Sequence, residues 1–408
     1  MPRHRYIPRA IEPVLRKAAA QFPAVVLTGP RQSGKTTLLR HVFGGTTDYV
    51  SLEPPDVRAA ASADPRGFLD LHPGPAIFDE VQYAPSLLPY IKERIDEHRG
   101  TRGQYFLTGS QNLLLTEQVT ESLAGRAAML RLLPISRREE FGRSLDPLPW
   151  ESGGSSSNPS HTTPAKLWQS VLRGGYPELV AEPDRDIALW HSSYVQTYLE
   201  RDVRSLRQVG DLVSFQNFLR ALAARAGQLL NLTDISRDLG VALNTVKAWL
   251  SVLEATFQVL VLRPYHANVG KRLVKTPKVY FTDTGLLCYL AGLKDPDHAA
   301  AGPLGGAIFE TAVLLEVLKA YVNRGEEPHL YFWRTATGVE VDLVIESGGK
   351  LIPVEVKLSA TPRPGMAASI TSFREDLGVR AAPGFVIHPG EIRLPLAPKT
   401  LAIPFSQL

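Results

Sequence analysis

The sequence predicts an α/β protein whose N-terminal part is a parallel sheet flanked by helices. Two observations indicate this class. An amphipathic helical stretch over residues 8–21 is followed, up to residue 132, by several short apolar stretches that read as buried strands. The first of these strands, residues 24–28, runs directly into a glycine-rich turn and then into an apolar helix. That order is typical of the strand–loop–helix unit of a parallel sheet.

The glycine-rich turn has the spacing G-x-x-x-x-G-K-T of a phosphate-binding loop. Only such a turn lets backbone N–H groups come close to a triphosphate, and the helix that begins at Lys35 adds its positive end. We expect Lys35 to reach the β- and γ-phosphates and the Thr36 hydroxyl to ligate Mg²⁺. The residues expected to bind the nucleotide are Gly29, Pro30, Arg31, Gln32, Ser33, Gly34, Lys35, Thr36, Thr37 and Ser110.

An acidic pair, Asp79 and Glu80, ends the apolar stretch that begins at Ala76. Behind a phosphate-binding loop, we expect Asp79 to hold the Mg²⁺ shell and Glu80 to polarise the attacking water. Such a pair is also a common strand exit, and its position after the loop favours the functional interpretation. Ser110 or Gln111, at the end of the next strand, is expected to sense the γ-phosphate, with a simple turn as the alternative.

Length and composition set the remaining limits. With 408 residues, 44% hydrophobic and 21% charged, the chain is typical of a soluble globular protein of two or three domains. No apolar run is long enough to cross a bilayer, and the N-terminus lacks the pattern of a signal peptide. The single cysteine, Cys288, fits a reducing cytoplasm. A net charge of +4 permits a nucleic-acid partner without requiring one.

Several stretches resemble a prokaryotic family of AAA-type P-loop ATPases. In the N-terminal part they are residues 29–36, 77–80, 107–110, 122–126 and 132–136. Further along they are residues 174–178, 198–202 and 281–285. The resemblance therefore covers nearly the whole chain. It implies a nucleotide-binding parallel sheet that uses ATP and Mg²⁺, followed by a C-terminal domain that resembles a nuclease.

AAA-type ATPases often complete their site with an arginine from a neighbouring subunit, so the resemblance also implies a homo-oligomer. Arg126 is the candidate for that arginine, and a solvated arginine is an equally good interpretation.

Composition suggests four segments. We expect an ATPase domain over residues 1–145, a flexible Pro-, Gly- and Ser-rich insert over 146–165, a helical and winged-helix region over 166–300, and a nuclease-like domain over 301–408. Residues 186–206 read as one helix. The charged residues Glu200, Arg201 and Asp202 near its end read as a structural ion-pair cluster, with contact to the nucleotide as the alternative.

Two capped helices, residues 233–240 and 244–254, precede two strand-like stretches, which is the order of a winged helix. Its functional interpretation is DNA binding through a face that carries Thr245, Lys247 and Ser251. The face holds only one cation, so a pure packing module is an equal alternative. The cations expected near DNA phosphates are Arg263, Lys271, Arg272, Lys275 and Lys278.

In the last domain, a Gly348-Gly349 turn joins two strands. The first carries Asp342, and the second carries Glu355 and Lys357 on a common face, so that two carboxylates face one cleft. This D…E-x-K constellation resembles restriction-endonuclease-like nucleases. The resemblance implies Asp342, Glu355 and Lys357 as catalytic residues. It implies Glu310, Asp342 and Glu355 as metal ligands, beside Thr36 and Asp79 of the first site. The alternative is a salt-bridged hairpin on an inactive relic of that fold.

The sequence thus predicts a cytoplasmic, ATP-hydrolysing enzyme without a membrane partner, in which Lys35 and Glu80 are catalytic. DNA or another protein is the expected substrate or partner. Two alternatives remain open: a metal-dependent nuclease gated by ATP, and a non-catalytic switch that binds DNA or protein according to nucleotide occupancy.

Overall fold

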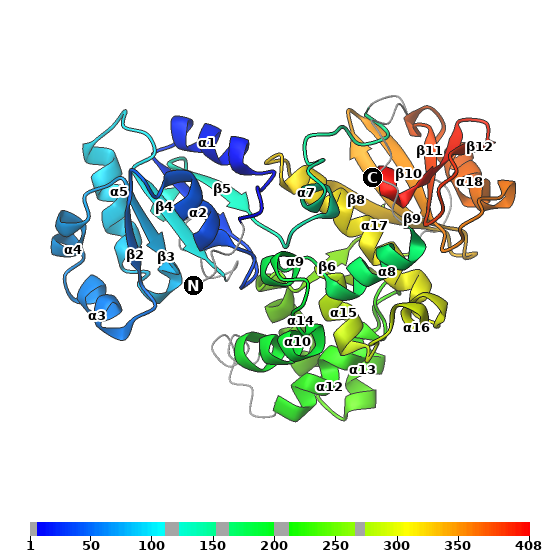
Figure 1. Ribbon diagram of the computed structural model, residues 1–408, viewed down its shortest axis with the longest axis horizontal. Coiled ribbons are helices and arrows are strands. Elements are labelled where there is room, and N and C mark those ends of the chain that lie inside the picture. The colour runs from blue at the N-terminus through cyan, green and yellow to red at the C-terminus, as the bar shows by residue number, and fades with distance from the viewer. Residues whose placement is uncertain (1–5, 111–121, 152–162, 200–211, 266–273) are drawn as a thin grey trace.

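The computed structural model describes residues 6–110, 122–151, 163–199, 212–265 and 274–408. Figure 1 shows an N-terminal sheet at one end of the molecule and a C-terminal sheet at the other, with a largely helical region between and below them. Gln111, Glu200, Arg201, Asp202, Lys271 and Arg272 lie outside the described residues.

The N-terminal sheet has five parallel strands in the order β2-β3-β4-β1-β5, which confirms the predicted α/β class. Its strands are β1 (Ala24–Thr28), β2 (Asp48–Ser51), β3 (Ala76–Asp79), β4 (Tyr105–Gly109) and β5 (Ala127–Arg131). The helices of this part are α1 (Glu12–Gln21), α2 (Lys35–Phe43), α3 (Pro55–Ala63), α4 (Pro65–Leu71), α5 (Leu87–Glu97) and α7 (Arg137–Glu140).

Strand β1 is buried on both faces because it lies inside the sheet. Val25 and Leu27 pack on one face against α1 and α2. Ala24 and Val26 face the opposite core, which α3, α4 and α5 cover. This alternation explains the uninterrupted apolar run in the sequence, as expected for a strand covered by helices on both sides.

The middle region is mostly helical, with one two-stranded antiparallel sheet, β6 (Val259–Leu262) and β7 (Lys278–Phe281). Its helices are α8 (Pro164–Arg173), α9 (Pro177–Ala181), α10 (Ile187–Tyr194), α12 (Leu212–Ala223), α13 (Leu232–Leu239), α14 (Leu243–Ala255), α15 (Thr284–Leu290) and α16 (Pro296–Ala301). The helix expected over residues 186–206 is α10, which passes into a π-helical turn, Val195–Leu199.

The C-terminal part is a six-stranded mixed sheet in the order β12-β13-β11-β10-β9-β8. Its elements are α17 (Gly305–Val322), β8 (His329–Arg334), β9 (Glu340–Ser347), β10 (Lys350–Val356), α18 (Ala368–Leu377), β11 (Gly384–His388), β12 (Leu394–Ala397) and β13 (Thr400–Pro404). Gly348 and Gly349 both have positive φ and close the β9–β10 hairpin, as the sequence predicts. No described helix has the length and apolar character needed to span a bilayer.

The first part of the predicted flexible insert is packed, which corrects that expectation for residues 146–151. Leu148 is fully buried, and the Trp150 indole N–H donates to the Tyr321 hydroxyl at 3.1 Å. Glu151 forms a paired ion contact with Arg324 at 2.6 and 3.0 Å. The contacts of Trp150 and Glu151 hold the segment at the end of α17 despite its Pro- and Gly-rich surroundings. Residues 152–162 lie outside the described part.

The segment from Leu132 to Glu139, which we call the junction segment, connects the N-terminal sheet to the other parts. Arg9, which is buried, pairs with Glu139 at 2.9 Å and donates to the Leu133 carbonyl at 2.7 Å. Glu139 also closes a capping box with Ser136 at the start of α7. From α17, Lys319 donates to the Ile135 carbonyl at 3.2 Å. The junction segment therefore holds three parts of the chain together.

We expect Glu139→Gln to destabilise the protein by about 3 kcal/mol, because it leaves the Arg9 guanidinium buried without its counter-charge. Adjacent Glu140 is exposed, and Glu140→Gln should change the free energy of unfolding by less than about 0.5 kcal/mol. Urea unfolding of the two variants beside the wild type measures the difference. Equal stabilities of the two variants would contradict the assignment.

The same pair predicts a pH dependence. Burial raises the pKa of Glu139, but the charge of Arg9 and hydrogen bonds from Ser136, Arg9 and Ala10 outweigh it and lower that pKa overall. A lowered folded-state pKa gives stability that is present above the ordinary value of 4.5 and is lost as the pH falls through the folded pKa. The stability gap between wild type and Glu139→Gln should therefore be constant above about pH 5 and shrink on acidification.

Candidate functional site

The loop between β1 and α2 has a backbone that only glycine allows at its ends. Gly29 has φ +149°, and a Cβ placed there would lie 2.1 Å from the Leu132 carbonyl oxygen. Gly34 has φ +92° and caps α2. The loop therefore packs closely against the residue that follows β5. Gly29 allows this close approach, and Gly34 allows the turn into α2, as the sequence suggested.

Lys35 folds back over this loop. It is buried, and its Nζ donates to the carbonyl oxygens of Gly29 at 3.1 Å and Pro30 at 2.9 Å. Beside it, the buried Ser33 hydroxyl has no hydrogen-bond partner among the described residues. An ammonium held over the loop and an unsatisfied hydroxyl inside it suit an anionic ligand, because both groups gain a stronger partner when a phosphate oxygen arrives.

Asp79, at the end of β3, is the centre of the polar network below the loop. It is buried, and the Thr36 hydroxyl donates to its two carboxylate oxygens at 2.8 and 2.9 Å. The Tyr49 hydroxyl donates to Asp79 Oδ2 at 2.9 Å, and the Thr108 hydroxyl donates to Oδ1. The two residues expected to share a Mg²⁺ shell are thus brought into direct contact.

Glu80 follows Asp79 in a left-handed conformation, with φ +56°. Its backbone N–H donates to the Thr108 hydroxyl oxygen at 3.0 Å, and its Oε2 accepts from the Ser110 hydroxyl at 3.2 Å and from the Gln82 amide. Burial raises the pKa of Glu80, but the charges of Lys35 and Arg31 and these hydrogen bonds lower it overall. The group is therefore held as a carboxylate, the form that can accept a proton.

The residues at this site fit a Mg²⁺-bound triphosphate, as judged by the unsatisfied Ser33 hydroxyl and the paired oxygens of Thr36 and Asp79. Sequence reasoning missed Tyr49, Gln82 and Thr108. A polar residue in the otherwise apolar stretch before Ser110 was a usable signal for Thr108. Tyr49 carried none, because its proximity to Asp79 depends on how the strands are paired. Gln82 is only two residues from Glu80, and its contact depends on the left-handed turn at Glu80.

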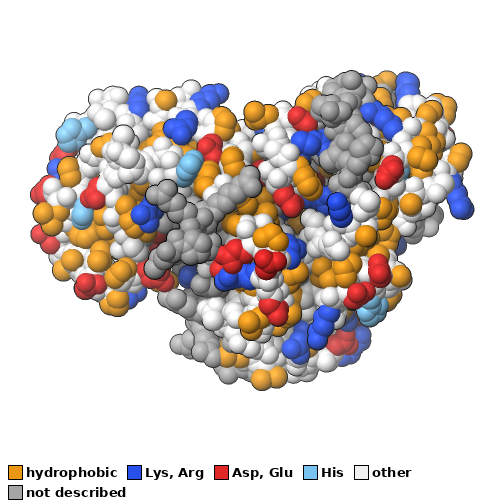
Figure 2. Space-filling view, viewed as in Figure 1, with side chains coloured by type: hydrophobic (Ala, Val, Ile, Leu, Met, Phe, Trp, Pro, Cys, Tyr) orange, Lys and Arg blue, Asp and Glu red, His pale blue; other side chains and the backbone are white. Residues whose placement is uncertain are grey.

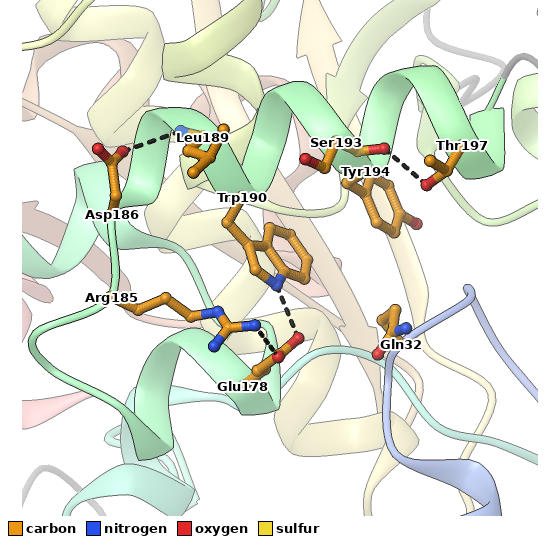
Figure 3. A pocket seen from close by; sticks show the side chains of 9 residues that line it. All are labelled: Gln32, Glu178, Arg185, Asp186, Leu189, Trp190, Ser193, Tyr194 and Thr197. Atoms are coloured by element: carbon orange, nitrogen blue, oxygen red, sulfur yellow. Dashed lines mark hydrogen bonds and ion pairs between the residues drawn. The ribbon is translucent and has the colours of Figure 1, made fainter.

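The helical region approaches the loop from its open side. Pro177 lies 3.5 Å from the position of a Cβ on Gly34, and the Tyr194 hydroxyl lies 3.5 Å from the Arg31 carbonyl oxygen. Between them is a cavity of about 430 Å³. Figure 3 shows Gln32 of the loop on one side of this cavity and Trp190 of α10 on the other, with the indole N–H directed at Glu178.

Arg126, the candidate for an arginine that completes a neighbour's site, is paired within its own chain. Its guanidinium donates to both carboxylate oxygens of Asp96 at 2.9 Å. The pair is partly exposed. An arginine held in this way would have to leave Asp96 before it could reach another subunit.

The described cations that were expected to contact DNA differ in exposure. Lys278 is only 2% exposed and is paired with Glu310 and Glu340, so the expectation that it contacts a phosphate is wrong. It is buried because β7 directs it into the C-terminal part. Lys247, Arg263 and Lys275 are exposed. In Figure 2, the described basic side chains on the visible face are interspersed with acidic ones.

The C-terminal constellation predicted from the hairpin comes together, with β9 and β10 antiparallel in the register that puts Leu343 beside Val354. Asp342 accepts from the Val356 backbone N–H at 2.8 Å. Glu355 accepts from Lys357 and, at 2.7 Å, from the Ser369 hydroxyl. Glu310 of α17 lies at the same cluster and accepts from Lys278 at 3.0 Å and from the Tyr280 hydroxyl. We call Glu310, Glu340, Asp342 and Glu355 the carboxylate cluster.

Charge repulsion and burial shape this cluster. Burial and the neighbouring Asp342 raise the pKa of Glu310 to about 8 and that of Glu355 to about 7. Two ammonium groups, Lys278 and Lys357, balance part of the charge. Among the residues that the structure describes, no three His, Cys, Asp or Glu side chains are spaced to hold a metal ion. In this arrangement the carboxylates pair with lysines and do not form a set of metal ligands.

Comparison with known proteins shows to which family the chain belongs. Residues 21–141 match an AAA domain, residues 164–297 a domain of unknown function (DUF8612), and residues 305–408 another domain of unknown function (DUF4143). Uncharacterized proteins of Mycobacterium bovis and Mycobacterium tuberculosis are each 34% identical over 398 residues, which is 97% of this chain and 82% of theirs. This chain belongs to the same family as those mycobacterial proteins. Its N-terminal part is an AAA-type P-loop ATPase domain.

Solved structures are more distant from this chain. A Walker-type ATPase of Pyrococcus abyssi is 15% identical, with a TM-score of 0.46 over 71% of this chain and 97% of that one. The Holliday junction branch migration motor RuvB of Thermotoga maritima is also 15% identical, with a TM-score of 0.29 over 61% of this chain and 88% of that one. Scores this low do not establish a shared overall fold, and the assignment rests on the AAA-domain match.

The loop geometry predicts a sharp contrast between two glycines of the AAA domain. Gly29→Ala should cost at least about 2 kcal/mol of stability or lose the loop conformation, because its Cβ would collide with the Leu132 carbonyl. A Cβ on Gly45, just after α2, has nothing within 4 Å. Gly45→Ala should therefore behave as wild type in thermal unfolding and in binding of a fluorescent ATP analogue. Wild-type behaviour of Gly29→Ala would contradict the described close approach.

Proposed function

We propose that this protein binds Mg²⁺-ATP at the β1–α2 loop and hydrolyses it. The observation that carries the proposal is the direct contact of the Thr36 hydroxyl with both oxygens of Asp79, beside a Glu80 that is kept ionised. In this proposal Thr36 and Asp79 hold the metal ion, which supplies charge neutralisation to the phosphates when bound.

In this proposal, Lys35, Glu80 and Ser110 each have a separate role in hydrolysis. The Lys35 ammonium, released from the Gly29 and Pro30 carbonyls, neutralises the phosphate tail. Glu80 Oε2 orients a water and accepts its proton, since the charges around it favour the carboxylate. The Ser110 hydroxyl, 3.2 Å from Glu80, is placed to hold that carboxylate and to contact a bound γ-phosphate.

Two substitutions test this assignment. Lys35→Ala should abolish binding of ATP, and Glu80→Gln should keep binding while lowering turnover by about 10²–10⁴-fold, the usual contribution of a general base. Equilibrium binding of a fluorescent ATP analogue and steady-state phosphate release measure the two effects. Wild-type turnover in both variants would overturn the proposal, and tight Lys35-dependent binding without any wild-type turnover would favour the non-catalytic switch.

A second candidate, the ATP-gated nuclease, has weaker support. Asp342, Glu355 and Lys357 do lie together, but Lys278 and Lys357 already pair with cluster carboxylates. The residues as arranged do not fit a metal ion, and we derive no cleavage step from them. DNA binding by the middle region, which follows from the winged-helix order of its elements, remains a proposal. Assembly into a homo-oligomer, which follows from the family resemblance, is a proposal as well.

A nicking assay decides the second candidate. Supercoiled plasmid and single-stranded DNA and RNA would be incubated with Mg²⁺ or Mn²⁺, with and without ATP, in wild type and Asp342→Asn. We expect no nicking that depends on Asp342, because Lys278 and Lys357 already pair with carboxylates of the cluster. Nicking that disappears in Asp342→Asn would contradict this expectation and establish the nuclease. ATPase rates measured with the same nucleic acids would show whether one of them is the partner.

A further inference from the structure

One short strand, β7, contacts the carboxylate cluster directly and is linked to the phosphate-binding loop through a neighbouring turn. All four of its residues, Lys278–Phe281, are buried, and it pairs antiparallel with β6. Its first residue reaches the carboxylate cluster, and the loop that follows its last residue reaches the turn that covers the phosphate-binding loop.

At the cluster, β7 supplies a cation and a phenol. Lys278 Nζ lies 3.0 Å from Glu310 Oε1 and 2.5 Å from Glu340 Oε1, and the Tyr280 hydroxyl donates to Glu310. Lys278 and Tyr280 are two residues apart and so project from one face of the strand. Glu310 and Glu340 belong to α17 and β9 of the C-terminal part, so β7 reaches across a boundary between two parts of the chain.

At the other end, Asp283 holds a glycine turn. Asp283 is 1% exposed, caps α15, and accepts from the Gly175 backbone N–H at 2.7 Å. A Cβ on Gly174 would lie 2.3 Å from Asp283 Oδ1, so the turn packs too closely against this carboxylate to admit a side chain. The Gly175 carbonyl in turn accepts from Ile135 of the junction segment at 2.7 Å.

The glycine turn leads straight to the phosphate-binding loop. Pro177, at the start of α9, lies 3.5 Å from the Cβ position of Gly34, next to the lysine and threonine that would bind phosphate. The Tyr194 hydroxyl adds a second contact near the Arg31 carbonyl. A bound triphosphate that shifts the loop therefore meets this turn directly.

We propose that β7 couples the two sites, so that a nucleotide on the loop and the insertion of Lys278 between Glu310 and Glu340 bias each other. A buried strand moves with its packed neighbours as a unit, because interiors are close-packed and do not deform continuously. Lys278 is then an internal counter-ion of the carboxylate cluster whose position depends on the nucleotide. Withdrawal of Lys278 leaves the cluster anionic and open to an external cation.

This inference rests on the proposed nucleotide binding, and its test uses the reciprocity of coupled equilibria. If the sites are coupled, removal of the Lys278 charge must change the affinity of the loop for nucleotide. The full-length protein would be titrated with a fluorescent ATP analogue and Mg²⁺ in wild type, Lys278→Met and Lys294→Met. Lys294 is an exposed lysine in the loop after α15 and gives the same charge change without a buried partner.

We expect Lys278→Met to change the dissociation constant of the analogue by at least about fivefold and Lys294→Met by less than twofold. In an Asp283→Asn background, which weakens the link to the glycine turn, the effect of Lys278→Met should disappear. The same effect with and without Asp283 would overturn the proposed route through β7, and equal effects of the two lysine variants would overturn the coupling.

Two further readouts keep the test decisive. If Lys278→Met does not fold, Glu310→Gln replaces it in the test. This variant keeps a hydrogen-bond partner for Lys278 and Tyr280 but removes a charge from the cluster, and it should also shift the affinity for nucleotide. An unchanged affinity in Glu310→Gln then counts against the coupling. A wild-type protein that does not bind the analogue at all would refute the proposed function, whereas normal wild-type binding with no shift in any cluster variant would refute only the coupling.

Discussion

The junction segment is the constraint on which the rest of this structure depends. Its first residue, Leu132, places a carbonyl where only a glycine can pass, and so fixes the start of the phosphate-binding loop. Its last residue, Glu139, receives the buried Arg9 guanidinium, which also donates to the Ser33 carbonyl inside that loop at 2.9 Å. Eight consecutive residues thus set the loop, the N-terminal segment and the docking of the other two parts.

The phosphate-binding loop and the carboxylate cluster differ in how charge acts on their buried carboxyl groups. At the loop, the charges of Lys35 and Arg31 lower the pKa of Glu80 despite its burial. In the C-terminal part the acids are in excess, and burial together with mutual repulsion raises the pKa values of Glu310 and Glu355. The first arrangement suits an incoming anion, while the second is balanced by lysines that belong to the protein itself.

The sequence predicted those features that are encoded locally. The spacing of Gly29, Gly34 and Lys35, the apolar run before Asp79, and the Gly348-Gly349 turn each specify a conformation within a few residues. Features that depend on packing across the chain escaped it. Thr108 and Tyr49 meet Asp79 only because β2, β3 and β4 are neighbours, and the burial of Lys278 depends on α17 lying against β7. The packing of residues 146–151 escaped prediction because their surroundings are rich in Pro, Gly and Ser, although the segment contains the apolar residues Leu148 and Trp150.

Helix α17 gives the protein one further property. Fifteen of its eighteen residues are buried, and its side chains belong both to the core of the C-terminal sheet and to that of the helical region. Such a helix has no polar face to turn toward water. The C-terminal part therefore cannot be cut away cleanly before residue 305, because fragments on either side would expose half of a shared interior. In evolution, the two halves of this interior must change in step, as partners in an obligate complex do.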